Sequence, residues 1–492
     1  MADKKKSGSV MITTIHSLIG IAIMFLFRFL PISLPEVTPT GMEILGIFLG
    51  TLYLWTTVDP IWSSVLCIAA IGMSSYAPMA GVLTTAFGSP VVAQMLFMMI
   101  YTGALVHEKI TLHIGRWFLT RKIAEGRPWL LIYFITLGAY VMVAFTGSPF
   151  APIFLFWPIL YGMFQQVGMT RDDKFAKLSV ILVVVGCLCG FGVPPYVSNP
   201  MAMLNNYRQI AAAQGSDVVL NDGMYFICYF ILGLIAMTAA VLFCKFVFRP
   251  DASKMKSITV ADLNKNKLEP LTLRQKVLAY SFVVLILCML LPCWFPNAPV
   301  LSFLGDNSMG LALVFVALLC ALRIEGKPVI DFLPVMEKQV AWPSYFIIVA
   351  AILISSVLTA ESTGITAFLN VVLSPIFSGM NSVVFTIVLM VLMMVLTNLC
   401  NSFVIGVVLQ PVMLSFCMAN GINAAPIVSL SIFFVLSNAM VTPSASPFAA
   451  LLFGNKDWLD AKDVYIHCGI LALLELVVVL VVGIPLSNLF MG

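Results

Sequence analysis

The chain has 492 residues, of which 61% are hydrophobic and only 10% are charged, and its mean hydropathy is +1.04. A soluble core cannot absorb that much apolar surface, so we predict an all-α polytopic membrane protein. The net charge of +4 gives no reason to expect a nucleic-acid partner. The 11 cysteines show no disulfide or metal spacing, and no nucleophile or phosphate-binding motif stands at a plausible spacing, so we expect no enzyme.

Most apolar runs are about 18 to 25 residues long, the length that a helix needs to cross roughly 30 Å of hydrocarbon. The first run has no small-residue cleavage site, so we expect it to be a retained span. In chain order the runs predict eleven transmembrane helices, two of them broken, at 10–30, 41–58, 61–80, 88–106, 175–204 (broken), 223–247, 277–295, 308–322, 343–360, 425–453 (broken) and 464–488.

Two further apolar blocks, 129–169 and 381–420, are too long for one helix. Each carries polar residues at mid-length, TGSPF in the first block and NLCNS in the second. Each block is therefore either two full crossings or one re-entrant hairpin, and both options leave the loops on the same sides. The turns lack the charged residues that are usual at a water interface, which favours two hairpins.

The placement of lysine and arginine predicts the orientation. With a cytoplasmic amino terminus, all 26 basic residues except Arg28 and Arg208 fall on the cytoplasmic side. The stretch 339–455 holds no basic residue, as a second hairpin that faces the exterior requires. We therefore expect a multi-pass protein of a lipid membrane, the bacterial inner membrane, with its amino terminus in the cytoplasm.

The arrangement occurs twice, about 250 residues apart. Glu108 in ALVHEKITLHIGRWF matches Glu361 in VLTAESTGITAFLN, TGS at 146 matches CNS at 400, and GVPPYVSNP at 192–200 matches MVTPSASPF at 440–448. Each half reads as a span, an amphipathic segment, a hairpin with a polar tip and a span broken by proline. The predicted orientation inverts the halves, and inverted repeats with discontinuous helices are typical of secondary transporters.

The broken spans expose polar backbone, because Pro194, Pro195 and Pro200 remove N–H donors and interrupt the helix. Oxygen-bearing side chains could coordinate a small cation, while helix amino termini at the tips favour an anion. The candidates are Ser148, Ser198, Asn199, Asn401, Ser402, Thr442, Ser444 and Ser446. Neither hairpin nor break holds a lysine or arginine, so we expect dipoles, neutral donors and co-bound cations to hold a small anionic substrate. In the alternative, these hydroxyls bond to their own helices and the prolines only kink packed spans.

These motifs resemble the divalent anion:sodium symporter family of the ion-transporter superfamily, from about residue 40 onward. In that family each hairpin tip carries Ser-Asn-Thr, then an apolar run and a proline, and each broken span carries a Thr-Pro-Pro-like turn. The second half matches fairly well, with Cys400-Asn401-Ser402, Pro411 and Thr442-Pro443-Ser444. The first half matches less closely, with Thr146-Gly147-Ser148, Pro158 and Val193-Pro194-Pro195.

The resemblance implies a homodimer whose transport domain slides against a fixed scaffold as an elevator. It implies that a dicarboxylate, a tricarboxylate or sulfate is held near the tips, by Thr146, Gly147, Ser148, Ser198, Asn199, Asn401, Ser402, Thr442, Pro443 and Ser444. It also implies a coupling sodium ion between each tip and its break, at Ser148, Gly192, Thr397, Cys400, Asn401 and Thr442. Gly147 replaces the family's asparagine, so sodium coupling through the second site alone and sodium-independent carboxylate exchange both stay open.

The same resemblance suggests a division of the chain into seven parts. These are scaffold helices at 1–106, an interfacial arm helix at 107–127, the first half of the transport domain at 128–248, a cytoplasmic linker at 249–276, further scaffold helices at 277–360, a second arm helix at 361–379 and the second half of the transport domain at 380–492.

Glu475 lies in the middle of the last predicted span, where a carboxylate is unfavourable and suggests a function. It either stays protonated and bonds to a neighbouring helix, or it couples transport to protons. A second class of function is therefore a cation or proton antiporter of the same superfamily, in which Glu475 or Glu361 carries the ion. An ion channel is less favoured, because the sequence has no selectivity-filter run.

Overall fold

The structure, a computed structural model, describes residues 2–111, 113, 126–216, 220–257, 270–295, 297–340, 342–358, 360–365, 367–368, 371, 380–399 and 401–492. Within these ranges every regular element is a helix except one short β-hairpin, which confirms the all-α prediction. Most of both predicted arm helices, 107–127 and 361–379, and residues 258–269 of the predicted linker lie outside the described residues.

The first group of helices precedes the first long apolar block. It comprises α1 (Ala2–Leu26), η1 (Phe27–Phe29), α2 (Pro39–Thr57), α3 (Pro60–Met73), α4 (Met79–Phe87) and α5 (Pro90–His107). Proline begins α2, α3 and α5, where its missing N–H would have no helical partner anyway. Polar caps complete two of these ends, since Thr38 accepts from the Gly41 N–H at 3.0 Å and Asp59 from the Ile61 N–H at 2.9 Å.

The second group contains the first predicted hairpin and the first broken span. It comprises α7 (Pro128–Thr146), α8 (Phe150–Gln166), α9 (Lys174–Phe191), α10 (Ser198–Ala213), α11 (Asp222–Phe243) and the π turn η3 (Cys244–Phe248). Both α7 and α8 pack on α9. The break between α9 and α10, residues 192–197, is buried throughout, as irregular backbone inside a membrane has to be.

The third group precedes the second long apolar block. It comprises η4 (Ser253–Ser257), α13 (Leu273–Trp294), α14 (Pro299–Asp306), α15 (Ser308–Ala321), β1 (Arg323–Ile324), β2 (Lys327–Pro328), α16 (Phe332–Lys338), α17 (Trp342–Leu358) and η5 (Glu361–Thr363). The strands β1 and β2 pair antiparallel. Arg274 at the start of α13 forms an ion pair with Glu108 beyond α5 and donates to the Pro328 carbonyl at 3.1 Å, which fixes α13 and the strands to α5.

The fourth group repeats the element order of the second. It comprises α19 (Ser382–Leu399), α20 (Ser402–Val408), α21 (Gln410–Ala419), α22 (Ala424–Ser437), α23 (Pro447–Gly454), α24 (Ala461–Val478), η6 (Val479–Gly483) and α25 (Ile484–Met491). A helix pair with a polar turn is again followed by a buried helix, a break at 438–446 and a short helix. The second break, like the first, falls where proline and small polar residues predict it.

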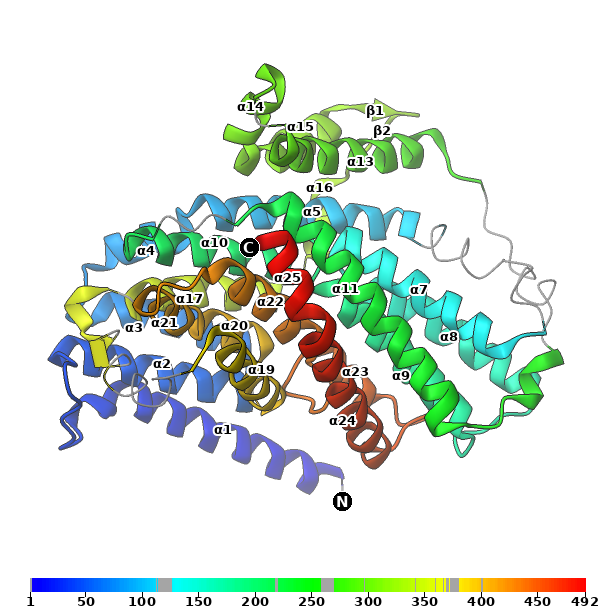
Figure 1. Cartoon of the computed structure of the whole chain (residues 1–492), viewed down its shortest axis with the longest axis horizontal. Helices are drawn as coiled ribbons and strands as arrows, with labels where there is room; N and C mark the ends of the chain where they lie inside the picture. Colours follow the sequence, from blue (N-terminus) through cyan, green and yellow to red (C-terminus); the bar gives the residue numbers. More distant parts are fainter. Residues whose placement is uncertain are drawn as a thin grey trace.

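The groups pack in two sets. The second and fourth groups interlock, because α10 lies against α20, α21 and α22; Gln410 donates to the Met203 carbonyl at 3.0 Å and accepts from Asn206 at 2.6 Å. In the other set, α17 packs on α3, and α15 and α16 pack on α5. The sets meet where α10 contacts α5 and α17, and where α20 contacts α17. Figure 1 shows α13–α15 and the strands at one edge of the molecule and α1 at the opposite edge.

The described helices include eight that are long and apolar enough to cross a membrane, or up to ten if each of two bent pairs is one span. The chain is thus a multi-pass membrane protein. The span predicted at 61–80 is shorter in the structure, since α3 ends at Met73, where the Ser74 hydroxyl donates to the Ile71 carbonyl at 2.6 Å. The short helix α4 follows at 79–87, almost entirely outside the predicted spans. The helix α14, which bends 89° into α15, has no counterpart among the predicted spans.

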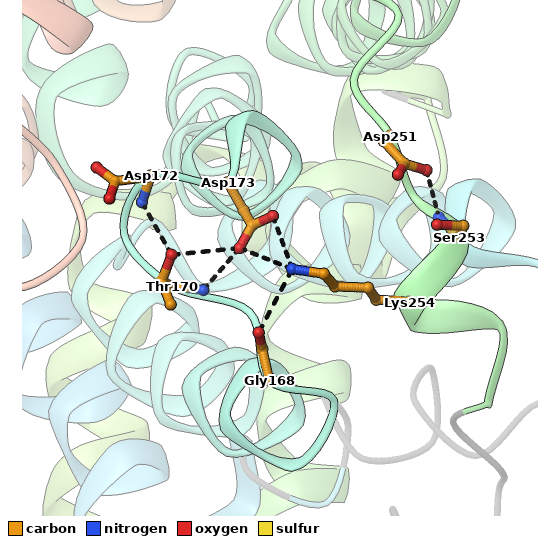
Figure 2. Close-up of polar contacts among 7 residues, drawn as sticks. All are labelled: Gly168, Thr170, Asp172, Asp173, Asp251, Ser253 and Lys254. Atoms are coloured by element: carbon orange, nitrogen blue, oxygen red, sulfur yellow. Dashed lines mark hydrogen bonds and ion pairs between the residues drawn. The ribbon is translucent and has the colours of Figure 1, made fainter.

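A polar cluster holds the turn between α8 and α9, as Figure 2 shows. The Asp173 carboxylate accepts from the Thr170 N–H at 2.7 Å and from Lys254 of η4 at 3.2 Å, and Lys254 also donates to the Gly168 carbonyl at 3.4 Å. Next to Lys254, Met255 is 1% exposed. The segment that leads from the first repeat toward the second therefore begins docked on the base of the α7–α8 pair.

Candidate functional site

The first tip, residues 146–149, joins α7 to α8. Gly147 has φ +64°, a left-handed conformation that glycine adopts freely, and its N–H donates to the Val143 carbonyl at 2.7 Å to close α7. The Thr146 hydroxyl donates to the Met142 carbonyl at 2.7 Å and accepts from the Ser148 N–H at 3.4 Å. Within the described part of the chain, no protein group bonds to the Ser148 hydroxyl.

A cavity of about 580 Å³ opens beside the first tip. Its walls come from both sets of helices: Thr146, Gly147, Ser148 and Phe150 at the first tip, Thr102 and Gly103 of α5, and Lys338, Gln339 and Val340 at the end of α16. Lys338 is the only charged side chain among the described lining residues. It is exposed and forms no ion pair with a described residue, so it adds one positive charge to the described lining of the cavity.

The second tip, residues 399–402, joins α19 to α20. Asn401 caps α20, because its side chain accepts from the Phe403 N–H at 3.0 Å, and the Ser402 N–H donates to the Ala445 carbonyl at 3.0 Å. Asn401, Ser402 and Asn199 line a small hollow of about 40 Å³, together with Ser446. The structure thus brings these predicted site residues from both repeats together. Ser198 begins α10, but its side chain is outside the described part, as is Cys400.

Thr442 and Ser444 in the second break bond to the second tip. The Thr442 hydroxyl donates to the Asn398 carbonyl and the Ser444 hydroxyl to the Leu399 carbonyl at 3.1 Å, and the two hydroxyls lie 2.9 Å apart. Neither these residues nor the exposed Pro443 between them line the cavity or the hollow. The two hydroxyls therefore fasten the break to the tip in this conformation.

Phe448 separates the two spaces. Its ring lies edge-on to Phe150 at 4.9 Å and to Phe191 at 5.2 Å between centroids. Phe448 and Phe191 line both the cavity at the first tip and the hollow at the second. Six of the predicted substrate residues accordingly fall into two sets, Thr146, Gly147 and Ser148 at the cavity and Asn199, Asn401 and Ser402 at the hollow, with these two aromatic residues lining both spaces.

The predicted sodium ligands fit a hard cation in the second half better than in the first. The Thr397 hydroxyl is fully buried and has no partner among the described residues, which leaves its oxygen available as a ligand. Thr442 and Asn401 supply further oxygens nearby on the same tip and break. In the first half, the Gly192 carbonyl already accepts from the Tyr225 hydroxyl at 2.8 Å.

The sequence reasoning missed four residues of this region. Lys338 was used only to predict which loops are cytoplasmic, although it is the last basic residue before the stretch 339–455, which has no lysine or arginine. Asn398 and Asn438, buried amides beside the second tip and break, could have been noticed as polar residues within apolar helices. Phe448 carries no sequence signal, since phenylalanine is common in this chain.

A helical membrane protein with two tips, two broken helices and a cavity between packed sets of helices has the organisation of a secondary transporter. The chain belongs to the sodium:sulfate symporter family, whose transmembrane-region model matches residues 12–491. Its fold is similar to that of the YdaH transporter of Alcanivorax borkumensis, whose crystal structure is described as having an unusual topology. The two chains are 14% identical, the match covers 92% of this chain and 97% of that chain, and the TM-score is 0.56. No curated protein sequence matches the chain.

Family membership confirms the resemblance that the motifs indicate. The protein is a secondary transporter of anions in a membrane, and it is not an enzyme.

Proposed function

We propose that this protein carries a small divalent anion, namely a dicarboxylate, a tricarboxylate or sulfate, across the membrane together with sodium. The observation that carries the proposal is the cavity of about 580 Å³ at the first tip, whose wall combines Ser148 with Lys338, the one charged side chain among its described lining residues. A cavity shared by two packed sets of helices is where a moving domain would pick up its cargo.

Three features of the cavity favour an anion. The 17-residue helix α8 begins at Phe150, on the cavity wall, so its amino-terminal dipole favours negative charge there. The Ser148 hydroxyl can donate a hydrogen bond. The Lys338 ammonium adds a full positive charge from the opposite set of helices. Under the predicted orientation Lys338 is cytoplasmic, so we take this conformation to face inward.

We propose that the second and fourth groups of helices form the transport domain of an elevator and that the first and third groups form the scaffold of a homodimer. The α7–α8 pair acts as one re-entrant hairpin in this scheme, and α19 with α20–α21 acts as the other. Neither hairpin counts among the eleven predicted crossings. Lys338 belongs to the scaffold in this scheme. It would attract the anion in the inward-facing state and lose contact with it when the transport domain moves.

Sodium would bind at the second tip, where Thr397, Asn401 and Thr442 supply oxygens. Its positive charge would then lie near the hollow that Asn199, Asn401 and Ser402 line. Exchange of one carboxylate for another without sodium is the second candidate, because Gly147 leaves the first tip without the amide that the family uses there.

Uptake into proteoliposomes tests the proposal. Labelled sulfate, succinate and citrate are supplied with and without an inward sodium gradient, and then with unlabelled anion inside. We expect a sodium gradient to drive accumulation of at least one of these anions, and Lys338→Gln to weaken it where Lys327→Gln, a change on the exposed β-hairpin, does not. Uptake that needs internal anion and ignores sodium would favour exchange. Sodium/proton exchange with no anion uptake would refute the proposal in favour of an antiporter.

A further inference from the structure

Glu475 is a buried carboxylate that the proposed anion and sodium sites do not use. It lies in α24 and is 5% exposed. One of its oxygens, Oε2, accepts from the Asn438 amide at 3.2 Å, whereas Oε1 has no hydrogen-bond partner among the described residues. A buried carboxylate whose polar neighbours, Asn438 and Ser437, are both neutral calls for an explanation.

The elements packed against α24 offer no compensating positive charge. From α9 the Cys189 thiol interacts with the carboxyl. The lysines of α9 are at its start, where Lys177 pairs with Asp463 at 2.7 Å, twelve residues or about 18 Å along α24 from Glu475. The titratable groups of α11 are acidic or neutral and are engaged elsewhere: Asp222 pairs with Arg208, the Tyr225 hydroxyl donates to the Gly192 carbonyl, and the Tyr229 hydroxyl and the Cys228 thiol lie against Ser487. The helices α19 and α23 have no titratable side chain.

The groups of α22 that face Glu475 are neutral as well. Asn438 donates to the carboxylate, and the Ser437 hydroxyl donates to the Phe433 carbonyl at 2.9 Å. No ion pair among the described residues includes Glu475. An ionised carboxylate with only neutral donors around it in a membrane interior is strongly unfavourable, while its protonated form is not. The surroundings therefore favour a bound proton.

A chain of hydrogen bonds connects this carboxyl with the second tip. Asn438 accepts from the Asn398 amide at 3.1 Å while it donates to Glu475. Asn398 in turn accepts from the Val441 N–H at 2.9 Å, and its carbonyl accepts from the Thr442 hydroxyl. The side-chain amides of both asparagines have hydrogen-bond partners on nitrogen and on oxygen. A change of charge at Glu475 therefore has to alter at least one of these hydrogen bonds.

We propose that Glu475 binds and releases a proton during transport, and that Asn438 and Asn398 transmit its protonation state to the second tip and break. Loss of the proton gives an anion that draws the Asn438 amide toward itself. Thr442, whose hydroxyl is held by Asn398, then changes its position relative to Thr397, and with it the geometry offered to a cation. The inference rests on the proposed function, because it assigns a regulator to the same site.

The direct test is the pH dependence of uptake in Glu475→Gln, which keeps the shape of the side chain but cannot lose a proton. We expect wild-type anion uptake to change with pH, by up to about tenfold per pH unit on the steep side of its profile, and uptake by the variant to change less than twofold over the same range. Glu325→Gln makes the same chemical change in the exposed β1–β2 turn and should keep the wild-type profile. If uptake by Glu475→Gln depends on pH as uptake by the wild type does, the inference is overturned.

Carbodiimide labelling tests the inference without transport. The reagent, dicyclohexylcarbodiimide, reacts with protonated carboxyl groups in apolar surroundings: the acid proton passes to a carbodiimide nitrogen, the carboxyl oxygen adds to the central carbon, and no atom leaves. We expect a wild-type adduct at Glu475, detected by mass spectrometry, whose yield falls several-fold as the pH rises. Labelling at other carboxyls with none at Glu475, or a yield independent of pH, overturns the inference. Wild-type protein that is labelled in this way but moves no anion refutes the proposed function alone.

Discussion

At the scale of single residues, the two tips turn the chain by different means. Gly147 ends α7 at φ +64°, whereas Asn401 begins α20 at φ −64° and ψ 128°, with its side chain as the cap. The motifs align these two positions, yet one is a helix carboxyl-terminal cap and the other an amino-terminal cap. The asymmetry between the tips is thus a difference in backbone conformation and not only in side chain.

The first prediction concerns Asn401, which we expect to contact sodium or the anion. Asn401→Ala should abolish uptake while the protein stays folded, because losing a helix cap costs only about 1 kcal/mol. Asn423→Ala is the matched control: Asn423 caps α22 and accepts from the Ala425 N–H at 3.0 Å, as Asn401 accepts from the Phe403 N–H at 3.0 Å. Equal uptake kinetics in the two variants would remove Asn401 from the site.

The second prediction concerns the first tip. Asparagine tolerates the left-handed conformation better than most residues, so Gly147→Asn should fold and restore an amide beside the cavity. We expect its uptake to require a different sodium concentration from that of the wild type. Gly168→Asn, at φ +66° in the turn after α8, introduces the same residue in the same conformation away from the cavity. If both variants keep the wild-type sodium dependence, the glycine has no part in coupling.

At the scale of elements, α23 contributes the aromatic side chain that divides the site. Phe448→Leu should shorten this partition at a cost of about 1 kcal/mol and join the hollow to the cavity. We expect uptake of the larger citrate to rise several-fold relative to sulfate. Phe453→Leu truncates the other aromatic ring of α23, which packs on Tyr465 at 4.9 Å. The same citrate-to-sulfate ratio in both variants would contradict a partition at Phe448.

The turn between α8 and α9 has a pH dependence of its own. The Thr170 N–H and the Lys254 ammonium lower the pKa of Asp173 below its ordinary 3.8. A carboxyl group with a lowered pKa in the folded protein stabilises the fold at pH values above its ordinary pKa. This stabilisation is lost as the pH falls through the lowered pKa.

Asp173→Asn should therefore loosen the docked segment at neutral pH, by about 1 kcal/mol, which raises amide exchange around Met255 roughly fivefold. The difference from the wild type should shrink below a pH of about 4. Asp172→Asn, at the exposed neighbouring position, should change nothing. An exchange rate at Met255 that is the same in all three proteins would show that the cluster does not hold the segment.

Local chemistry in the sequence is enough to predict several elements. Proline and small polar residues predict both breaks, because proline cannot continue a helix and the flanking runs are apolar. The same reasoning cannot place the end of α3 at Met73, since serines at 74 and 75 are compatible with a continuing helix. In the structure the Ser74 hydroxyl donates to the Ile71 carbonyl and the Ser75 hydroxyl to the distant Glu43 carboxylate. In Figure 1 the helix α14 lies at the far edge of the molecule with α15, and its eight residues are too short to be recognised as a span.

At the scale of the whole molecule, the cavity depends on residues that are distant in sequence. Lys338 is close to the first tip only because α16 packs on α5, where a side chain in place of Gly103 would meet Gln339 at 2.9 Å. The pairing of Asn398 with Asn438 similarly depends on how α19 and α22 pack. The sequence therefore predicts the family and the tip residues, whereas the charge of Lys338 beside the first tip and the connection to Glu475 require the structure.

The central claim is that the first tip lines an anion path that opens alternately to the two sides of the membrane. Modification of Ser148→Cys by a membrane-impermeant maleimide tests it most directly, with wild-type protein and Ser253→Cys as controls. We predict that the new thiol reacts from the cytoplasmic side, reacts from the exterior during transport, and is protected several-fold by the transported anion. A reaction rate at position 148 that no anion changes, or reaction from one side under all conditions, would contradict the account.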